Sequence, residues 1–358
     1  ITQTGITPGT VTDPMSGGVI NPISTYPYPD FKPERTKSYE VGINARFLNG
    51  RISFDGTFYQ SNTYNQTFLS VMSPATGYSG FYVQAGNVRN RGVEMTLGYN
   101  DTFGKVNYST HLTYTANQNK IVEMVHDYRN PIDNSLVNIT ELTLKEAGDV
   151  YLREGYSMSD VFTTGILQRG RDGKLVEEGN GYQVDRSQRI RLGSADPDFT
   201  MGWRHDINYK NISLGLMITG RFGGIVTSQT QAFMDAFGVS KVSAEARDNG
   251  GVMLDGHRYD AERYYNTVGG QGLMSYYTYD ATNVRLQELS LTYSLPKKWL
   301  GDVFNNATIS FVGRNLFMFY RKAPFDPDMN GSTGTYNRSD FFMAPSLRNL
   351  GFSIKFSL

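Results

Sequence analysis

The chain has 358 residues, and its 34 Lys and Arg residues balance its 34 Asp and Glu residues, which leaves a formal net charge of zero. This balance gives no reason to expect a nucleic-acid partner. The chain contains no cysteine, which excludes disulfides and thiolate metal sites, and no apolar run reaches the roughly 18 to 20 residues of a membrane helix. The many Tyr, Phe and Gly residues favour β-strands and long loops.

Residues 37–60 predict a tall β-hairpin. Apolar residues such as Val41 and Ile43 alternate with polar or small ones, and the same period of two resumes after Asn49-Gly50. An Asn-Gly pair between two alternating stretches is the strongest short-range signal for a hairpin. Each strand would have about ten residues, whereas an ordinary soluble strand has about five or six. The hairpin therefore carries one apolar and one polar face over an unusual length.

The same alternation recurs to the C-terminus and predicts an all-β fold with nine tall strands. Their connections alternate between short turns and long loops, as in outer-membrane barrels, which have short periplasmic turns and long extracellular loops. Strands of about ten tilted residues also match the thickness of the hydrocarbon layer. The sequence therefore predicts a transmembrane antiparallel β-barrel. Its strands are 38–48, 51–62, 89–100, 105–117, 198–209, 211–222, 283–295, 306–320 and 347–358, and its extracellular loops are 63–88, 118–197, 223–282 and 321–346.

The alternation also assigns each strand residue to one of two faces. Apolar residues should face lipid and polar residues should face the lumen, and a slip of one residue would invert every assignment. Arg46 and Arg285 are also expected at inward or rim positions. The lipid-facing set includes Val41, Phe54, Leu97, Leu214, Leu291 and Ile354, and the lumen-facing set includes Glu40, Asp55, Glu94, Ser213, Glu288 and Lys355.

The long loops carry secondary structure of their own. The stretch 227–251 predicts a helix, because Thr227 or Ser228 can cap its start and Asn249-Gly250 can end it. Two further stretches predict small hairpins, 66–84 and 157–168.

Several segments resemble the SusC/RagA type of TonB-dependent outer-membrane transporter. Each segment alone is a weak signal, whereas the ordered set is specific. The segments lie in order along nearly the whole chain: KPERTKSYEVGI (32–43), GNVRNRGVEMTL (86–97), NVRLQELSLTYSLPKKWL (283–300), GRNLFMF (313–319), FDPD (325–328) and NLGFSIKFSL (349–358).

The resemblance implies a fold, a location and a set of partners. In that family a barrel of about 22 strands encloses an N-terminal plug domain, a Ton box engages TonB, and a SusD-like lipoprotein caps the extracellular mouth. This chain would be the C-terminal part of such a barrel, multi-pass in the lipid of the bacterial outer membrane. Residues 1–37 would be an extracellular loop segment and 38–358 barrel strands and loops. The plug would be absent from this chain, and TonB would act through an N-terminal region outside it.

A search for catalytic patterns finds none, and no cofactor or metal site is predicted. HExxH, GxSxG, P-loop and GxGxxG patterns are missing, and the four histidines are scattered without ligand spacing. Asp196-Pro197-Asp198 and Asp326-Pro327-Asp328 place paired carboxylates as a glycosidase would. Asp-Pro is a common turn element, however, and the turn interpretation is favoured. The chain is therefore not expected to be an enzyme.

The candidate for ligand recognition is a tyrosine-rich stretch, 257–280. Tyrosine offers a flat apolar face and a hydroxyl group, which suit sugar rings and peptide backbones alike. The alternative is that these side chains pack the loop on itself or against the capping lipoprotein. The candidate ligand-binding residues are Tyr259, Tyr264, Tyr265, Tyr276, Tyr277 and Tyr279.

The predicted function is that of a nutrient-importer subunit that takes up oligosaccharides or, as a second choice, oligopeptides. One alternative is another TonB-dependent receptor, for a metal chelate or cobalamin. A less favoured alternative from a different class is a secreted β-sandwich that binds glycans. A sandwich would be soluble without detergent, which separates it from the two barrel hypotheses.

Overall fold

The computed structural model describes residues 31–71, 80–129, 135–144, 151–300, 304–328 and 339–357, together with three two-residue strands nearer the N-terminus. The predicted extracellular segment 1–37 therefore lies mostly outside the described residues. The short strands are β1 (Val11–Thr12), β2 (Val19–Ile20) and β3 (Thr25–Tyr26).

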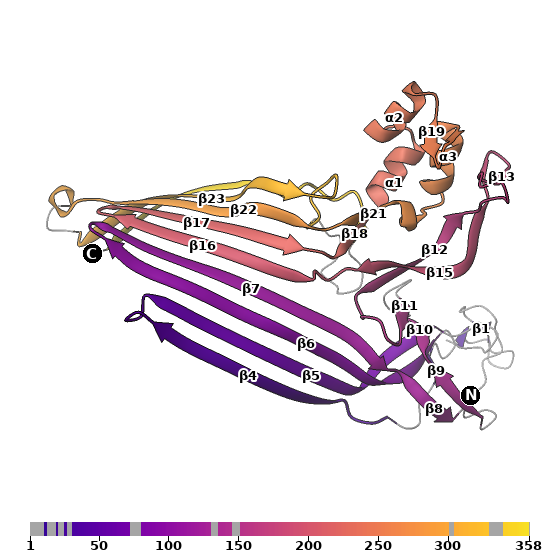
Figure 1. Ribbon diagram of the computed structural model, residues 1–358, viewed down its shortest axis with the longest axis horizontal. Coiled ribbons are helices and arrows are strands. Elements are labelled where there is room, and N and C mark those ends of the chain that lie inside the picture. Colours follow the sequence, from indigo (N-terminus) through magenta and orange to yellow (C-terminus); the bar gives the residue numbers. More distant parts are fainter. Residues whose placement is uncertain are drawn as a thin grey trace. The chain divides into compact units, whose positions relative to one another are not determined.

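Nine long strands follow one another in a single sheet, in the order β25-β23-β22-β17-β16-β7-β6-β5-β4 (Figure 1). The pairs from β7 to β25 are all antiparallel. All nine strands lie where the sequence predicts them, which confirms the all-β antiparallel prediction. Their bounds are β4 (Arg35–Phe47), β5 (Ile52–Val71), β6 (Gly80–Phe103), β7 (Val106–Glu123), β16 (Phe199–Tyr209), β17 (Ile212–Phe222), β22 (Asn283–Ser294), β23 (Asn306–Arg321) and β25 (Asn349–Ser357).

The chain divides into two compact units, and strands β4 to β7 contribute residues to both. The first unit comprises Ile1–Glu40, Tyr59–Arg91 and Gln118–Phe162, and the second comprises Val41–Phe58, Gly92–Asn117 and Thr163–Leu358.

Three strands of the sheet, β5, β6 and β7, run further than the sequence predicts, so that much of the expected loop 63–88 is strand. The apolar alternation stops early here, and polar pairs between neighbouring strands take its place. The Asn62 side-chain amide donates to Asn87 at 2.8 Å, and the Asn119 amide donates to Asn90 at 2.9 Å. A prediction based on apolar period alone misses such polar strand ends.

The tight turn at Asn49-Gly50 forms as predicted. Leu48, Asn49 and Gly50 have φ angles of 53°, 56° and 85°, in the left-handed region that Gly and Asn tolerate best. The Gly50 amide donates to the Phe47 carbonyl at 3.1 Å, which closes the turn.

The register of the second unit separates an apolar face of the sheet from a polar one. On the polar face, the Thr292 and Ser310 hydroxyls lie 2.9 Å apart. This pattern confirms that Leu214 and Leu291 share one face and that Ser213 lies on the other, whereas the orientation of these faces towards lipid and lumen stays a prediction. The apolar row reads Leu214, Leu291, Phe311 and Phe352, and the neighbouring polar row reads Ser213, Thr292, Ser310 and Ser353.

Strands β4 and β25 are the two edges of this sheet within the described residues. Nearly every residue of both strands is exposed, including the apolar Val41 and Phe352. Each of these two strands therefore pairs on one side only within the part of the chain that the structure describes.

The small elements of the first unit follow the end of β7. Strands β8 (Val125–Arg129) and β9 (Leu136–Ile139) pair with each other, as do β10 (Glu141–Thr143) and β11 (Tyr151–Arg153). Ile121 of β7, Met124 and Leu152 of β11 are fully buried.

The hairpin predictions need correction. Residues 157–168 hold one strand, β12 (Asp160–Leu167), which pairs with the distant β15 (Val184–Ser194) instead of folding back on itself. Residues 66–84 belong to the continuing strands β5 and β6 where they are described, and 72–79 lie outside the described residues. Short-range alternation shows a strand but not its partner, which explains the error at β12.

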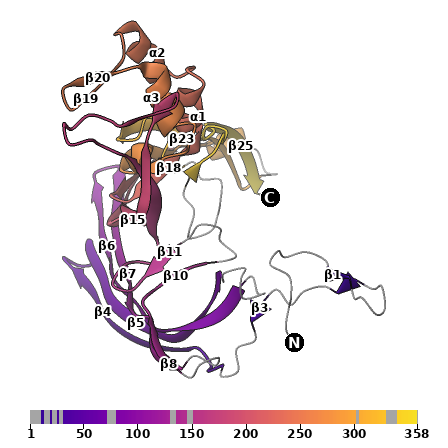
Figure 2. The same ribbon diagram turned by 90° about the vertical axis from the view of Figure 1, so that its right-hand side faces the viewer.

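The second unit carries a group of helices beyond the ends of β17 and β22 (Figures 1 and 2). The predicted helix 227–251 is two helices, because Gly238 is left-handed at φ 68° and Ser240 caps a second start. The predicted cap Ser228 is correct, and its hydroxyl accepts from the Gln231 amide at 3.0 Å. Among the described residues, no helix is long and apolar enough to cross a membrane. The elements are β18 (Ile225–Ser228), α1 (Gln229–Ala236), α2 (Lys241–Asp248), β19 (Val252–Leu254), β20 (His257–Tyr259), α3 (Ala261–Val268) and β21 (Thr278–Asp280).

Candidate functional site

The structure brings most of the candidate tyrosines together in one hydrophobic cluster of the second unit. We call residues 163–184 and 225–282 the loop module. Tyr279 lies apart, in a smaller cluster with Val226 and Ala323, and its ring packs against Phe325 with centroids 5.6 Å apart. The main cluster contains Tyr259, Tyr264, Tyr265, Tyr276 and Tyr277 together with Leu167, Leu175, Val268 and Leu273.

Burial separates the six tyrosines into two groups. Tyr277 is 3% exposed and Tyr259, Tyr264 and Tyr265 are each 8% exposed, whereas Tyr276 and Tyr279 are half-buried. The four buried rings therefore pack the loop on itself, as one of the two interpretations expects. Ligand contact by any of the six stays a prediction.

Two tyrosine hydroxyls connect the two parts of the loop module. The Tyr259 hydroxyl accepts from the Leu175 amide at 3.1 Å, and the Tyr276 hydroxyl accepts from the Leu167 amide at 3.0 Å. Burial raises the pKa of Tyr264 and of Tyr277 above the usual range, and it raises the pKa of Tyr279 to about 12. These phenols are therefore neutral at ordinary pH, which suits packing and hydrogen bonding.

Exposed aromatic residues lie on the outside of the module. The Phe233 ring lies 6.2 Å from Phe341 and 5.8 Å from Phe342, and Phe237 on the same helix is 77% exposed. We call these four residues the aromatic patch. Contiguous exposed apolar surface of this kind is typical of a binding surface.

The polar face of the sheet carries charges in pairs. Arg204 Nε and Nη2 each lie 2.8 Å from an oxygen of Asp206, and Arg314 Nε lies 3.0 Å from Glu288. Arg204 and Asp206 lie two positions apart on β16, and Glu288 of β22 pairs with Arg314 of β23. The polar face therefore offers hydrogen-bonding groups whose charges largely cancel.

Arg285 reaches the polar face because strand β22 is irregular. Strict alternation would place Arg285 and Glu288 on opposite faces, since three positions separate them. In the register with β17, Met217 pairs with Glu288 and Ile218 with Leu286, so Gln287 is an extra residue. Such a bulge shifts the alternation by one position and puts Arg285 on the same face as Glu288.

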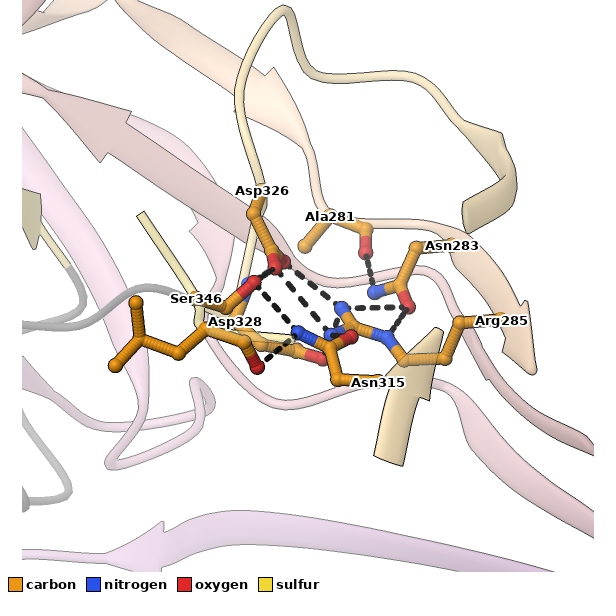
Figure 3. Close-up of polar contacts among 8 residues, drawn as sticks. Ala281, Asn283, Arg285, Asn315, Asp326, Asp328 and Ser346 are labelled. Atoms are coloured by element: carbon orange, nitrogen blue, oxygen red, sulfur yellow. Dashed lines mark hydrogen bonds and ion pairs between the residues drawn. The ribbon is translucent and has the colours of Figure 1, made fainter. Parts of the chain in front are cut away.

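The Arg285 guanidinium lies at the centre of a buried polar network, which we call the clasp (Figure 3). Its Nη2 lies 2.8 Å from Asp326 Oδ1 and 2.6 Å from Asp328 Oδ2, and its Nη1 lies 3.3 Å from Asp326 Oδ2. The side chains of Arg285 and Asp326 are 7% and 10% exposed, and that of Asp328 is 42% exposed. A buried carboxylate is therefore matched by the two-pronged donor that suits it best.

Amide and hydroxyl side chains complete the clasp. Asn283 Oδ1 accepts from Arg285 Nε at 3.2 Å, and Asn315 Oδ1 accepts from Nη1 at 3.4 Å. The Asn315 amide donates to Ser346 Oγ at 3.0 Å, and the Ser346 hydroxyl donates in turn to Asp326. Burial alone would raise the pKa of Asp326, but hydrogen bonds from Arg285 and Ser346 outweigh it and hold the pKa below its usual range.

Three of the sequence segments quoted for the family resemblance meet at this clasp. Arg285 comes from 283–300, Asn315 from 313–319, and both aspartates from 325–328. The roles of Asn283, Asn315 and Ser346 were not predicted. The ordered segments were the available signal, although one sequence does not show that they meet in space. The turn interpretation of Asp326-Pro327-Asp328 is confirmed, because residues 327–328 form a turn and the Asp328 amide donates to Asp326 Oδ1 at 3.1 Å.

Comparison with known proteins identifies the family. Residues 3–219 match the family model described as TonB dependent receptor-like, beta-barrel. The chain belongs to this family. The match confirms the predicted location in the outer membrane and the prediction that the chain is not an enzyme.

Two curated relatives come from Formosa agariphila. TonB-dependent receptor P3 is 25% identical over 371 residues, which cover 97% of this chain and 36% of the receptor. TonB-dependent receptor P26 is 25% identical over 321 residues, which cover 84% of this chain and 32% of the receptor. The chain thus spans about a third of the length of these relatives.

Solved structures of a peptide transporter share the fold. One chain of the RagAB peptide transporter superimposes with a TM-score of 0.67 at 17% identity, covering 97% of this chain and 38% of that chain. The RagAB peptide importer in its 'open-open' state gives 0.66 at 18% identity, covering 99% and 38%. The antiparallel sheet thus matches part of a TonB-dependent barrel, and the β-sandwich alternative is wrong.

Proposed function

We propose that this chain forms part of the wall and the outer loops of a TonB-dependent importer that takes up oligosaccharides or oligopeptides. The observation that carries the proposal is the sheet itself. One face is a continuous apolar row suited to lipid, and the other is lined by hydroxyls and charge-paired side chains. A face of the second kind lets a polar oligomer pass along the wall without trapping it at an unpaired charge.

The proposed topology places the short turns in the periplasm and the loops 63–88, 118–197, 223–282 and 321–346 outside the cell. The tight turns at Asn49-Gly50 and at Lys210, where φ is 51°, lie at the short-turn ends of their strands. The loop module would then face the medium. The exposed edges β4 and β25 would pair with barrel strands outside this chain, because an unpaired sheet edge is not tolerated in hydrocarbon.

The proposed partner is a SusD-like surface lipoprotein that covers the outer mouth, with TonB acting through a region outside this chain. Solved structures that share the fold include the RagAB peptide importer in 'closed-closed' and 'open-open' states. The aromatic patch supports a protein partner, since its rings project from helix α1 and from residues 341–342. Exposed aromatic residues of this type are enriched in protein–protein interfaces.

Substrate contact in this proposal falls to the tyrosine-rich stretch, as predicted from the sequence. Tyr276 and Tyr279 are the two candidates whose side chains are half-buried and so retain surface for a ligand. The four buried tyrosines would hold Tyr276 in place, whereas Tyr279 would be held by its packing on Phe325.

Uptake by whole cells tests the proposed function. A strain that lacks the full-length protein should lose growth on one class of nutrient, and a plasmid copy should restore it. The panel contains oligosaccharides, oligopeptides, metal chelates and cobalamin, and a strain without TonB is the matched control. Unchanged uptake of every oligosaccharide and oligopeptide would contradict the proposal, and selective loss of chelate or cobalamin uptake would favour the alternative receptor.

A further inference from the structure

The clasp holds the two ends of one connection between strands, both of them distant in sequence from Arg285, which lies on their N-terminal side. The base segment, residues 322–328, carries Asp326 and Asp328, and both bind Arg285 of strand β22. The return segment, residues 339–348, carries Ser346, which binds Asp326 and Asn315. One guanidinium group therefore gathers the start and the end of this connection at the rim of the sheet.

The return segment is also attached to the loop module. Its strand β24 (Ser339–Asp340) pairs in parallel with β18, so that Thr227 faces Ser339 and Ser228 faces Asp340. The buried Ser228 hydroxyl donates to the Asp340 carboxylate at 2.8 Å, at the residue that caps helix α1.

The base segment contacts the same small sheet. Ala323 is buried in one cluster with Val226 of β18 and Ala281, and Phe325 packs on Tyr279 of β21. Strands β21, β18 and β24 form one three-stranded sheet in that order. Strands β18 and β21 continue from β17 and into β22, so β24 adds a third strand to the connection between residues 225–282 and the wall.

We propose that Arg285 is the positioning residue of the loop module. By holding both segments at the rim, it keeps β24 in the three-stranded sheet and makes the module a fixed extension of the wall instead of a movable lid. Breaking a buried ion pair leaves an uncompensated charge, which is strongly unfavourable. The clasp should therefore be either closed or fully released.

A disulfide reporter can measure whether strand β24 of the return segment is paired with strand β18. Thr227 and Ser339 are paired across neighbouring strands, a spacing that a disulfide can bridge, and the chain has no cysteine of its own. The variant Thr227→Cys with Ser339→Cys is introduced into the full-length protein in outer membranes. The rate of cross-linking by a mild oxidant is then measured, and heat-modifiable migration on gels verifies that the barrel is folded.

The reporter should cross-link rapidly in the parent protein, and Asp326→Asn or Arg285→Gln should slow it by about tenfold or more. Arg285→Lys keeps the charge but loses the two-pronged geometry, so it should give an intermediate rate. The matched control is Asp206→Asn, which removes a half-exposed ion pair with Arg204 at 2.8 Å on strand β16, outside the clasp and the module, and should leave the rate within about twofold. A parent-like rate in a folded Asp326→Asn variant would overturn the proposal.

A milder variant keeps the inference testable if the charged variants fail to fold. Ser346→Ala leaves the ion pair intact and removes the two side-chain hydrogen bonds that join Ser346 of the return segment to Asp326 and Asn315. The loss of these two hydrogen bonds should slow cross-linking by about threefold or more. An unchanged rate would show that the clasp stabilises the rim without positioning the module.

Discussion

The sheet of the second unit and the loop module that continues from it are built on different rules. In the sheet, a period of two decides each residue's surroundings, and Leu214 and Ser213 differ only in which face they occupy. In the module no simple period holds, and neighbours such as Tyr264 and Tyr265 are both buried on one helix. The residue pattern of the sheet is decided by the lipid and the water on its two faces, whereas the residue pattern of the module is decided by packing in its own hydrophobic core.

The largest difference in local stability between the two regions should result from removing a buried aromatic ring from the module core. Tyr264→Ala removes a buried ring that packs on Tyr265 with centroids 5.2 Å apart, and a loss of about 3–5 kcal/mol in the module's local unfolding free energy is expected. Hydrogen exchange of the full-length protein in detergent should show faster exchange in α3 and no change in β17. Tyr276→Phe, which removes only a hydroxyl, is the control at about 1 kcal/mol. Equal loosening of β17 would mean that the two regions are not separable.

In the sheet, the loss of stability caused by an introduced arginine should depend on the face of the strand at which it is placed. Leu214→Arg places a charge on the apolar face and should cost about 2 kcal/mol or more, whereas Ser213→Arg on the polar face should cost much less. Denaturant titration of the folded barrel, followed by heat-modifiable migration, measures the difference. Equal tolerance at both positions would contradict the assignment of the two faces.

A substitution at Ser228, where strand β18 of the loop module leads into helix α1, should have a smaller effect on stability. Ser228→Ala removes the cap of α1 and the hydrogen bond to Asp340, for an expected loss of about 1–2 kcal/mol in the module. Ser228→Thr keeps the hydroxyl and should recover most of this loss, because a threonine can also cap. Local hydrogen exchange of α1 provides the measurement, and no difference between the alanine and threonine variants would count against the cap.

Most of the sheet could be predicted from the sequence because its pattern is local. Asn49-Gly50 and the alternating residues on either side define the first hairpin without information from elsewhere in the chain. The polar ends of β5 to β7 could not be predicted in this way, because pairs such as Asn62 with Asn87 leave no apolar signal. The pairing of β12 with β15 was also missed, because the sequence of one strand does not indicate which distant strand it pairs with.

The clasp was less accessible to prediction than the sheet. Arg285 was expected at an inward or rim position, but strict alternation around Glu288 would have reversed it, and only the bulge at Gln287 resolves the conflict. Asn315, with a left-handed φ of 51°, sits at a second irregularity in β23. Helix α3 was missed for a different reason, because its tyrosines suggest a ligand surface as readily as a buried helix face.

The smallest expected effect concerns the titration of the module's tyrosines. Burial, with a lesser contribution from Asp235, raises the pKa of Tyr279 from 10.0 to about 12 in the folded protein. The neutral phenol is thus favoured by folding, so its contribution is fully present below pH 10 and is lost as the pH rises towards about 12. The sheet should not share this alkaline transition. Tyr279→Phe should change stability at neutral pH by no more than about 0.5 kcal/mol, because the ring still packs on Phe325.

Alkaline titration of the full-length protein separates the packing of Tyr279 from its ionisation. Proteolysis of the module and the ultraviolet absorbance of tyrosinate are followed together as the pH rises above 10. Tyr279→Phe should shift the opening of the module to higher pH by a small amount, because Tyr264 and Tyr277, whose pKa values burial also raises, still ionise when the module opens. Tyr276→Phe is the control with a half-buried ring in the other cluster. If the module instead opened at the pH at which an exposed tyrosine ordinarily titrates, Tyr279 would not be buried in its apolar contact with Phe325.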